Sequence, residues 1–282
     1  MQTVTQLDPL RSAMDALRGD GAIALVPTMG ALHEGHLTLV REAKRRAAHV
    51  VVSIFVNPRQ FGPREDLSSY PRPIERDKKL LAAEGVSLLW HPDADAMYPD
   101  GYATTISVEG VSDGLCGAAR PGHFDGVATV VCKLFNQVRP DLALFGEKDW
   151  QQLAVIRRMA RDLDLVLPRA EAIHAVATVR EDDGLARSSR NTYLTAEQRA
   201  QAACLPRAMR QAADDARSGA GYDAVLGTLR ETLLAGGFSA VDYAEFRDAA
   251  TLELRSAPAA SPARLFVAAR IGTTRLIDNI AA

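Results

Sequence analysis

The stretch AIALVPTMGALHEGHLTLVREAKRRAAHVVVSIFV, residues 22–56, decides the fold. Residues 22–27 form a short apolar run that ends at a proline, and residues 49–56 are β-branched and apolar through their middle. Both runs are typical of strands buried on two faces. Between them, residues 36–46 place apolar side chains on one face and basic ones on the other, which predicts a helix. The stretch therefore predicts a β-α-β unit with a right-handed crossover.

The same alternation continues through the first half of the chain. Helices are predicted over residues 74–84, 127–138 and 150–163, and strands over residues 86–90 and 142–145. Such alternation is typical of a mostly parallel sheet covered by helices on both faces. Ligands of these sheets bind beyond the carboxyl ends of the strands.

The sequence changes character after about residue 175. Thr195 followed by Gln198 is a capping-box pattern, and a long alanine-rich helix is predicted from there to about residue 218. A second helix and three strands are predicted further on, over residues 222–235, 241–246, 265–270 and 275–280. Helices and strands are now grouped rather than alternating, which favours a smaller α+β domain.

A chain of 282 residues, 47 % apolar and 24 % charged, is typical of a globular protein of about two domains. We expect a Rossmann-like domain over residues 1–175 and a C-terminal α+β domain over residues 176–282. The 33 Lys and Arg against 35 Asp and Glu give a net charge of −2, which argues against a nucleic-acid partner. No apolar run is long enough to span a membrane, so we expect a cytoplasmic protein.

The segment PTMGALHEGH, residues 27–36, lies between a predicted strand and a predicted helix. Helix N-terminal amides and the helix dipole favour an anion there. His33 and His36 can reach one phosphate, and Gly35 lets the backbone approach it. Simple capping of the helix by either histidine is the alternative. The spacing H-E-x-H differs from the H-E-x-x-H of zinc proteases, so a metal site at the histidines is disfavoured.

Four further segments carry polar residues in similar settings. FGEKDWQQ (145–152) follows a strand and opens a helix, so Lys148 can neutralise a phosphate and Gln152 can bind a small polar substrate. RSSRN (187–191) offers hydroxyl and guanidinium groups to phosphate oxygens. The remaining two are VNPRQFG (56–62), at a strand end, and RPGHF (120–124), before a helix. An ordinary helix start is the alternative for FGEKDWQQ, and an Asn-Pro turn is the alternative for VNPRQFG. Because most of these segments meet at one rim of the sheet, we expect an ATP site there.

Together the segments resemble the motif series of the pantoate–β-alanine ligase family, the pantothenate synthetases. The series comprises PTMGALHEGH, SIFVNPRQFG, YPR, RPGHFDGVATVV, FGEKDWQQ and SSRNTYL in that family's order, and VAARIGTTRLIDNI is similar to its C-terminal strands. H-x-G-H alone is shared by many nucleotidylyltransferases and class I aminoacyl-tRNA synthetases, whereas the complete series is far more specific. The resemblance implies condensation of pantoate with β-alanine through a pantoyl adenylate, with release of pyrophosphate and AMP.

The resemblance also implies roles around ATP. The catalytic residues contact the triphosphate and are His33, His36, Lys148, Ser188, Ser189 and Arg190. The other ATP-binding residues are Met29, Gly35, Phe145, Gly146, Asp149, Val179 and Arg187. Asp77 corresponds to an acid near Mg²⁺. Arg187 stands where the family pattern has a methionine, so it could add a phosphate contact or alter lid closure.

The other two substrates are assigned in the same way. The resemblance assigns pantoate to Gln60 and Gln152, with its apolar side against Met29 and Phe61. Positions near the β-alanine pocket match Asn57 and Tyr70. The remaining substrate-binding residues are Pro27, Arg120 and His123. The adenylate is a mixed anhydride that water hydrolyses, so the C-terminal domain is expected to close as a lid. The resemblance further implies a homodimer.

Two other functions stay open on the sequence. One is another H-x-G-H nucleotidylyltransferase, which would transfer and keep the nucleotidyl group. The second is a non-catalytic ATP-binding or RNA-binding relative of the synthetases. The paired glutamines and the second domain favour the ligase, and the net charge of −2 argues against RNA.

Overall fold

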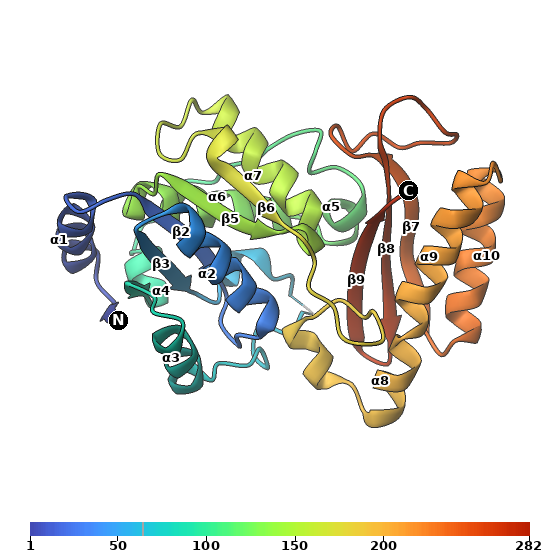
Figure 1. Cartoon of the computed structure of the whole chain (residues 1–282), viewed down its shortest axis with the longest axis horizontal. Helices are drawn as coiled ribbons and strands as arrows, with labels where there is room; N and C mark the ends of the chain where they lie inside the picture. Colours follow the sequence, from blue (N-terminus) through green and yellow to red (C-terminus); the bar gives the residue numbers. More distant parts are fainter. Residues whose placement is uncertain (64) are drawn as a thin grey trace. The chain divides into compact units, whose positions relative to one another are not determined.

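The computed structural model describes residues 1–63 and 65–282, which form two compact units. Unit 1 comprises Met1–Glu147 and Gln151–Ala177, and unit 2 comprises Lys148–Trp150 and Thr178–Ala282. Figure 1 shows the elements of each unit, coloured along the chain.

Unit 1 is built on a six-stranded parallel sheet in the order β1-β4-β3-β2-β5-β6. The strands are β1 (Gln2–Val4), β2 (Ile23–Thr28), β3 (His49–Ile54), β4 (Leu88–Trp90), β5 (Leu142–Gly146) and β6 (Ile173–Val176). The Rossmann-like parallel sheet is confirmed, and the four predicted strands are β2 to β5. Strands β1 and β6 were not predicted, because polar residues stand within each short run (QTV and IHAV) and leave no apolar stretch.

Helices cover both faces of this sheet. They are α1 (Leu7–Arg18), α2 (Glu34–Arg46), α3 (Ile74–Ala83), α4 (Ala94–Met97), α5 (Leu115–Ala119), α6 (His123–Val138) and α7 (Trp150–Asp162). α2 packs on β2, β3 and β5, and α1 packs against α6. Strands β3 and β5 lie on opposite sides of β2 in the sheet. Right-handed crossovers in these two directions place α2 and α6 on opposite faces. Helix α6 begins at His123, one turn before its predicted start.

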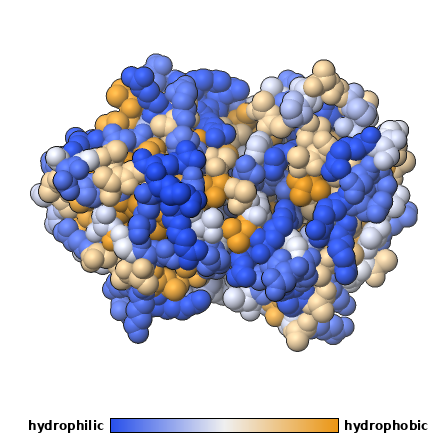
Figure 2. All heavy atoms as spheres, in the orientation of Figure 1, coloured by the Kyte–Doolittle hydropathy of each residue, from blue (hydrophilic) through white to orange (hydrophobic). Residues whose placement is uncertain are grey.

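The core of unit 1 explains why these segments fold as they do. The side chains of Val26, Val52 and Leu144 are completely buried, as expected for strands covered on both faces. Helix α2 turns Val40 and Ala43 into the same cluster. On the face drawn in Figure 2, hydrophobic side chains form small separate groups among hydrophilic ones. In the described part of the chain, no helix has the length and apolar character that crossing a membrane requires.

Unit 2 is an α+β structure. Its antiparallel sheet has the order β7 (Ala240–Asp248), β8 (Ala263–Ile271), β9 (Thr274–Ala281), and its helices are α8 (Ala196–Ala202), α9 (Cys204–Arg217) and α10 (Tyr222–Ala235). Residues of α9, α10 and the sheet share one apolar core, in which Tyr222 stacks on Phe246 with ring centroids 4.0 Å apart.

The helix beginning after Thr195 differs from its prediction in one respect. The capping box is confirmed, since Gln198 N donates to Thr195 Oγ1 and Thr195 N donates to Gln198 Oε1. The prediction of a single long helix is wrong, because the helix is interrupted at Ala203, between α8 and α9. Pro206 has no N–H with which to bond the carbonyl of Ala202, so the helix cannot run on unbroken.

The loop after β7 is held by one buried carboxylate. Asp248 Oδ1 accepts from the amides of Ala250 and Thr251, at 2.8 and 2.9 Å, and Oδ2 accepts from the Ser261 hydroxyl at 2.7 Å and from Arg255. The hydrogen bond from Thr251, followed by those from Ser261 and Arg255, holds the pKa of Asp248 well below its usual range.

We expect Asp248→Asn to lower the free energy of unfolding at pH 7 by about 2 kcal/mol, because hydrogen bonds to the charged form are lost. A depressed pKa gives stability that is present above the unfolded value of about 3.9 and is lost as pH falls further. The difference in unfolding free energy between Asp248→Asn and the unmodified protein should therefore become smaller as pH falls. Urea denaturation at several pH values measures it, with the exposed Glu253→Gln as the control. An equal deficit for the control would contradict the assignment.

Candidate active site

The loop after β2 leads directly into a pair of histidines that cap α2. His33 is the N-cap residue, and its Nδ1 accepts from the amide of Gly35 at 3.2 Å. His36 Nδ1 accepts in return from the amide of His33 at 3.4 Å. The two rings lie 4.1 Å apart between centroids. The capping alternative is thus part of the structure, and it fixes how both rings are oriented.

These bonds also determine the tautomer of each ring. A ring nitrogen that accepts from an amide N–H carries no proton, so Nδ1 of both His33 and His36 is unprotonated. In the neutral rings the proton is therefore on Nε2. Two Nε2–H donors next to a helix N-terminus are suited to a phosphate, because the helix dipole favours an anion at the same place.

Two side chains from other elements hold the loop that carries the histidines. Thr28 Oγ1 accepts from the amide of Gly30 and donates to Ser53 O. Asp77, in the first turn of α3, is 1 % exposed and accepts from the amides of Ala31 and Leu32. Burial raises the pKa of Asp77, although the two amide hydrogen bonds oppose this.

Asp77 is the residue that the sequence analysis placed near Mg²⁺. Both its oxygens are bonded to backbone amides. Among residues 1–63 and 65–282, no group of three or more His, Cys, Asp or Glu is arranged to hold a metal ion. The side chains present therefore do not fit a metal site built on Asp77.

The second part of the site is the 3₁₀ turn Pro58–Gln60, after β3. Asn57 is 1 % exposed, and its amide nitrogen donates to Gln60 Oε1 and to Gly126 O, both at 3.0 Å. Its oxygen accepts from Arg59 N and from the hydroxyl of Tyr98. All four hydrogen-bonding positions of the Asn57 amide are thereby occupied. Asn57, expected near the β-alanine pocket, thus holds the side chain of Gln60.

The backbone of Gln60 is held as firmly as its side chain. Its carbonyl oxygen accepts from His123 Nδ1 at 2.9 Å and from Arg120 at 3.2 Å. Arg120 also donates to His123 Nε2 at 3.0 Å and forms an ion pair with Glu65. Burial acts to raise the pKa of Glu65, but the hydrogen bonds and charge of Arg120 hold it below its usual value. Arg120 and His123 were expected in the substrate pocket, and their hydrogen bonds support Gln60.

Gly126 allows α6 to approach this turn closely. A Cβ at Gly126 would lie 2.3 Å from Arg59 O and 2.7 Å from Gln60 N, distances that no side chain tolerates. The same glycine supplies the carbonyl that Asn57 bonds. The position of Gln60 therefore depends on the missing side chain of a residue on a different helix.

The apolar residues of the predicted pocket lie beside this turn. Gln60 Nε2 contacts Met29 Sδ at 3.1 Å, and the ring of Phe61 meets that of Tyr70 edge-on, with centroids 6.0 Å apart. Pro27 lies in β2 opposite Ser53 of β3. These residues form one group around the carboxyl ends of β2 and β3.

At the carboxyl end of β5, Phe145 is buried and Gly146 ends the strand. Two adjacent glutamines follow in α7 and differ in burial and in hydrogen bonding. Gln151 is buried and bonded to Cys116 N and to the carbonyls of Val111, Asp113 and Gly114. Gln152, the predicted pantoate ligand, is half-buried and makes no side-chain hydrogen bond to the described residues.

The remaining predicted residues belong to unit 2. Lys148 and Asp149 form a 3₁₀ turn, and the carbonyl of Lys148 accepts from Asn279 Nδ2 at 2.9 Å. The turn of residues 189–193 begins at Ser188, whose hydroxyl accepts from the amide of Arg190 at 3.3 Å. Ser189 is its first residue.

Arg187, the departure from the family pattern, precedes that turn. Its amide donates to Val179 O at 3.0 Å, and its guanidinium pairs with Glu181 at 2.9 Å. The ion pair neutralises much of the added positive charge. A phosphate contact by Arg187 would therefore have to compete with Glu181.

Glu65 and Tyr98 support the site and were missed by the sequence analysis. Neither lies in a motif that follows a strand, and Tyr98 is 41 residues from the asparagine that it bonds.

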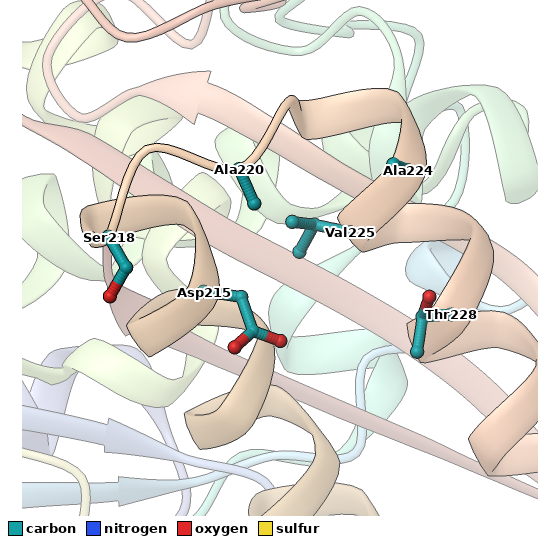
Figure 3. Close-up of a pocket in the computed structure, with 6 residues that line it drawn as sticks. All are labelled: Asp215, Ser218, Ala220, Ala224, Val225 and Thr228. Atoms are coloured by element: carbon teal, nitrogen blue, oxygen red, sulfur yellow. The ribbon is translucent and has the colours of Figure 1, made fainter.

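A separate hollow of about 250 Å³ lies between α9 and α10. As Figure 3 shows, Asp215, Ala220 and Val225 line it, and it contains no residue of the predicted site.

The histidine bonds give a prediction that needs no ligand. At about pH 8, where an ordinary histidine is neutral, long-range ¹H–¹⁵N spectra should show His33 and His36 protonated at Nε2. His123 is the internal control, because its Nδ1 donates to a carbonyl and its Nε2 accepts from Arg120. It should show the opposite tautomer. The same tautomer in all three rings would refute the assignment.

Comparisons with known proteins agree over the whole chain. The family model described as Pantoate-beta-alanine ligase matches residues 2–281. The pantothenate synthetase of Novosphingobium aromaticivorans is 67 % identical to this chain, over 99 % of this chain and 98 % of its own length. That of Sphingopyxis alaskensis is 58 % identical, over 99 % of both chains. The crystal structure of pantothenate synthetase from Thermus thermophilus has a TM-score of 0.91 at 47 % identity and covers 99 % of both chains. That of pantoate-beta-alanine ligase from Francisella tularensis, complexed with beta-gamma ATP and beta-alanine, has a TM-score of 0.85 at 33 % identity, over 100 % of this chain and 97 % of its own. This chain belongs to the pantoate–β-alanine ligase family.

Proposed function

We propose that this protein joins pantoate to β-alanine, using ATP, through a pantoyl adenylate. The observation that carries the proposal is the pair of capping histidines beyond the carboxyl end of β2, beside the fixed amide of Gln60. Family membership over the whole chain supports the same reaction.

The reaction has two steps. A carboxylate oxygen of pantoate attacks the α-phosphorus of ATP, the bond from that phosphorus to the bridging oxygen breaks, and pyrophosphate leaves. The amine of β-alanine then attacks the acyl carbonyl, loses a proton, and AMP leaves. Both partners of the first step are anions, so the site must neutralise charge as the new bond forms.

We assign this task in unit 1 to His33 and His36. Their Nε2–H groups donate to phosphate oxygens, and the N-terminus of α2 adds a favourable potential. The capping bonds hold both donors in advance, so little reorganisation is needed when charge develops. Gly35, Met29, Phe145 and Gly146 are proposed to line the nucleotide beside them.

We assign the β- and γ-phosphates to residues of unit 2. Lys148, Ser188, Ser189 and Arg190 offer an ammonium, two hydroxyls and a guanidinium, which suit phosphate oxygens. Asp149, Val179 and Arg187 are proposed to complete the nucleotide site. The adenylate must be protected from water, which supports a lid role for unit 2.

Mg²⁺ is proposed to accompany ATP, because it commonly takes phosphate oxygens and water as ligands. The side chains around Asp77 do not fit a metal site. We therefore propose that the triphosphate, and not a cluster of protein carboxylates, holds the ion.

We propose that pantoate lies between the amides of Gln60 and Gln152, with its apolar side on Met29 and Phe61. Gln60 is fixed by Asn57, Arg120 and His123, so its amide meets the substrate without losing much conformational entropy. Tyr70 and Pro27 are proposed to complete this pocket for pantoate and β-alanine. The resemblance alone carries the proposal of a homodimer, and the proposal of a cytoplasmic location rests on the sequence.

Pyrophosphate–ATP isotope exchange tests the reaction. We expect exchange with pantoate in the absence of β-alanine, and AMP release only when β-alanine is added. His36→Ala should slow exchange at least about 100-fold, because a phosphate donor is lost.

His49→Ala is the control, since His49 begins β3 at the opposite end of the sheet; it should retain exchange. Exchange with a nucleotide precursor in place of pantoate would instead support the nucleotidylyltransferase. Normal exchange by folded His36→Ala would remove the proposed role of that histidine.

The Gln60 turn gives a second prediction. Gly126→Ala forces the turn away from α6, so the KM for pantoate should rise about tenfold or more while the KM for ATP changes less. Gln60→Ala should act in the same direction. Gly227→Ala is the control, because a Cβ there meets no atom within 4 Å. Steady-state kinetics that show an unchanged KM for pantoate in folded Gly126→Ala would contradict this geometry.

A further inference from the structure

The loop between β2 and α2 has an unusual backbone. Gly30 has a φ of 82° and Ala31 a φ of 50°, and left-handed conformations are unfavourable for a residue with a side chain. Such a conformation persists only where the surroundings impose it. The imposing contacts are therefore important, because His33 follows Ala31 by two residues.

The contact that imposes it is made by a single carboxylate from another element. Asp77 lies in the first turn of α3, about 45 residues further along the chain. Its Oδ2 accepts from the amide of Ala31 at 2.8 Å, and its Oδ1 accepts from the amide of Leu32 at 2.9 Å. Each oxygen thus holds one of two successive amides, which fixes the direction of the loop and not only its position.

The surroundings leave little freedom for any other arrangement. Leu32 and Asp77 are each 1 % exposed. A Cβ on Gly30 would lie 3.0 Å from Ile54 Cγ2 and 3.2 Å from Asp77 Oδ2. The loop is therefore closely packed on both the strand side and the α3 side.

We propose that Asp77 is a positioning residue: it holds the backbone of residues 30–32 so that His33 and His36 present their Nε2–H groups to the triphosphate. The catalytic consequence of this positioning rests on the proposed function. In this assignment Asp77 touches none of the three substrates. It acts on the adenylation step through the two histidines.

The matched substitution is Asp77→Asn. The amide has nearly the same shape, but its nitrogen would face an N–H that needs an acceptor, so one of the two bonds is lost. We expect pantoate-dependent pyrophosphate exchange to fall at least about tenfold. The Mg²⁺ concentration that gives half-maximal exchange should stay unchanged, and the ¹⁵N signals of His33 and His36 should shift.

Glu75→Gln is the control. It removes the same charge from the same first turn of α3, and its exposed carboxylate forms an ion pair with Lys78 on its own helix. It should behave as the unmodified protein in all three measurements. If Asp77→Asn does not fold, the smaller Asp77→Ser is measured in the same way.

Two outcomes would overturn the proposal. One is an unchanged exchange rate in folded Asp77→Asn. The other is a raised requirement for Mg²⁺ with unchanged histidine signals, which would make Asp77 a metal ligand after all. If the unmodified protein shows no pantoate-dependent exchange, the proposed function fails, and the histidine signals still test the positioning.

Discussion

Parallel pairing of β2 with β3 on one side and β5 on the other is the constraint on which the rest of unit 1 depends. It brings three carboxyl ends to one edge, and the right-handed crossovers carry α2 and α6 to opposite faces. The connections that leave β2 and β5 therefore diverge at the sheet edge, which is where ligands of such sheets bind. The capping histidines and the Gln60 turn lie at this edge because each directly follows the end of a strand.

Buried amide and carboxylate groups then fix the loops. Asn57 uses all four hydrogen-bonding positions on protein partners, and Asp77 uses both oxygens on two successive amides. A buried polar group left unpaired is costly, so each satisfied group holds its loop in one conformation. The side chain of Gln151 is hydrogen-bonded to other parts of unit 1, whereas that of its neighbour Gln152 makes no such bond among the described residues.

The predicted site residues of unit 2 are of a different kind. Its core is the apolar layer between the antiparallel sheet and helices α9 and α10. Four of its predicted site residues, Lys148, Ser188, Ser189 and Arg190, are at two turns. These side chains carry positive charge or hydroxyls, which suits a flexible anion such as a triphosphate. The ion pair of Arg187 with Glu181 reduces the effect of the departure from the family pattern.

The sequence by itself determined the β-α-β unit, the parallel sheet, the second α+β domain and the family, because these follow from local periodicity and from motifs read in order. It also selected His33 and His36, although their tautomers needed the capping bonds. The break between α8 and α9 follows from Pro206, which the sequence itself contains. Only the tertiary structure decided that Asn57 serves Gln60 and that Asp77 holds amides. Asp77 bonds amides that lie 46 and 45 residues before it. Asn57 is only three residues from Gln60, but it also bonds the carbonyl of Gly126, 69 residues away, where α6 comes close because glycine has no side chain. A local pattern carries no information on such pairings, since they form only when the sheet has brought its connections together.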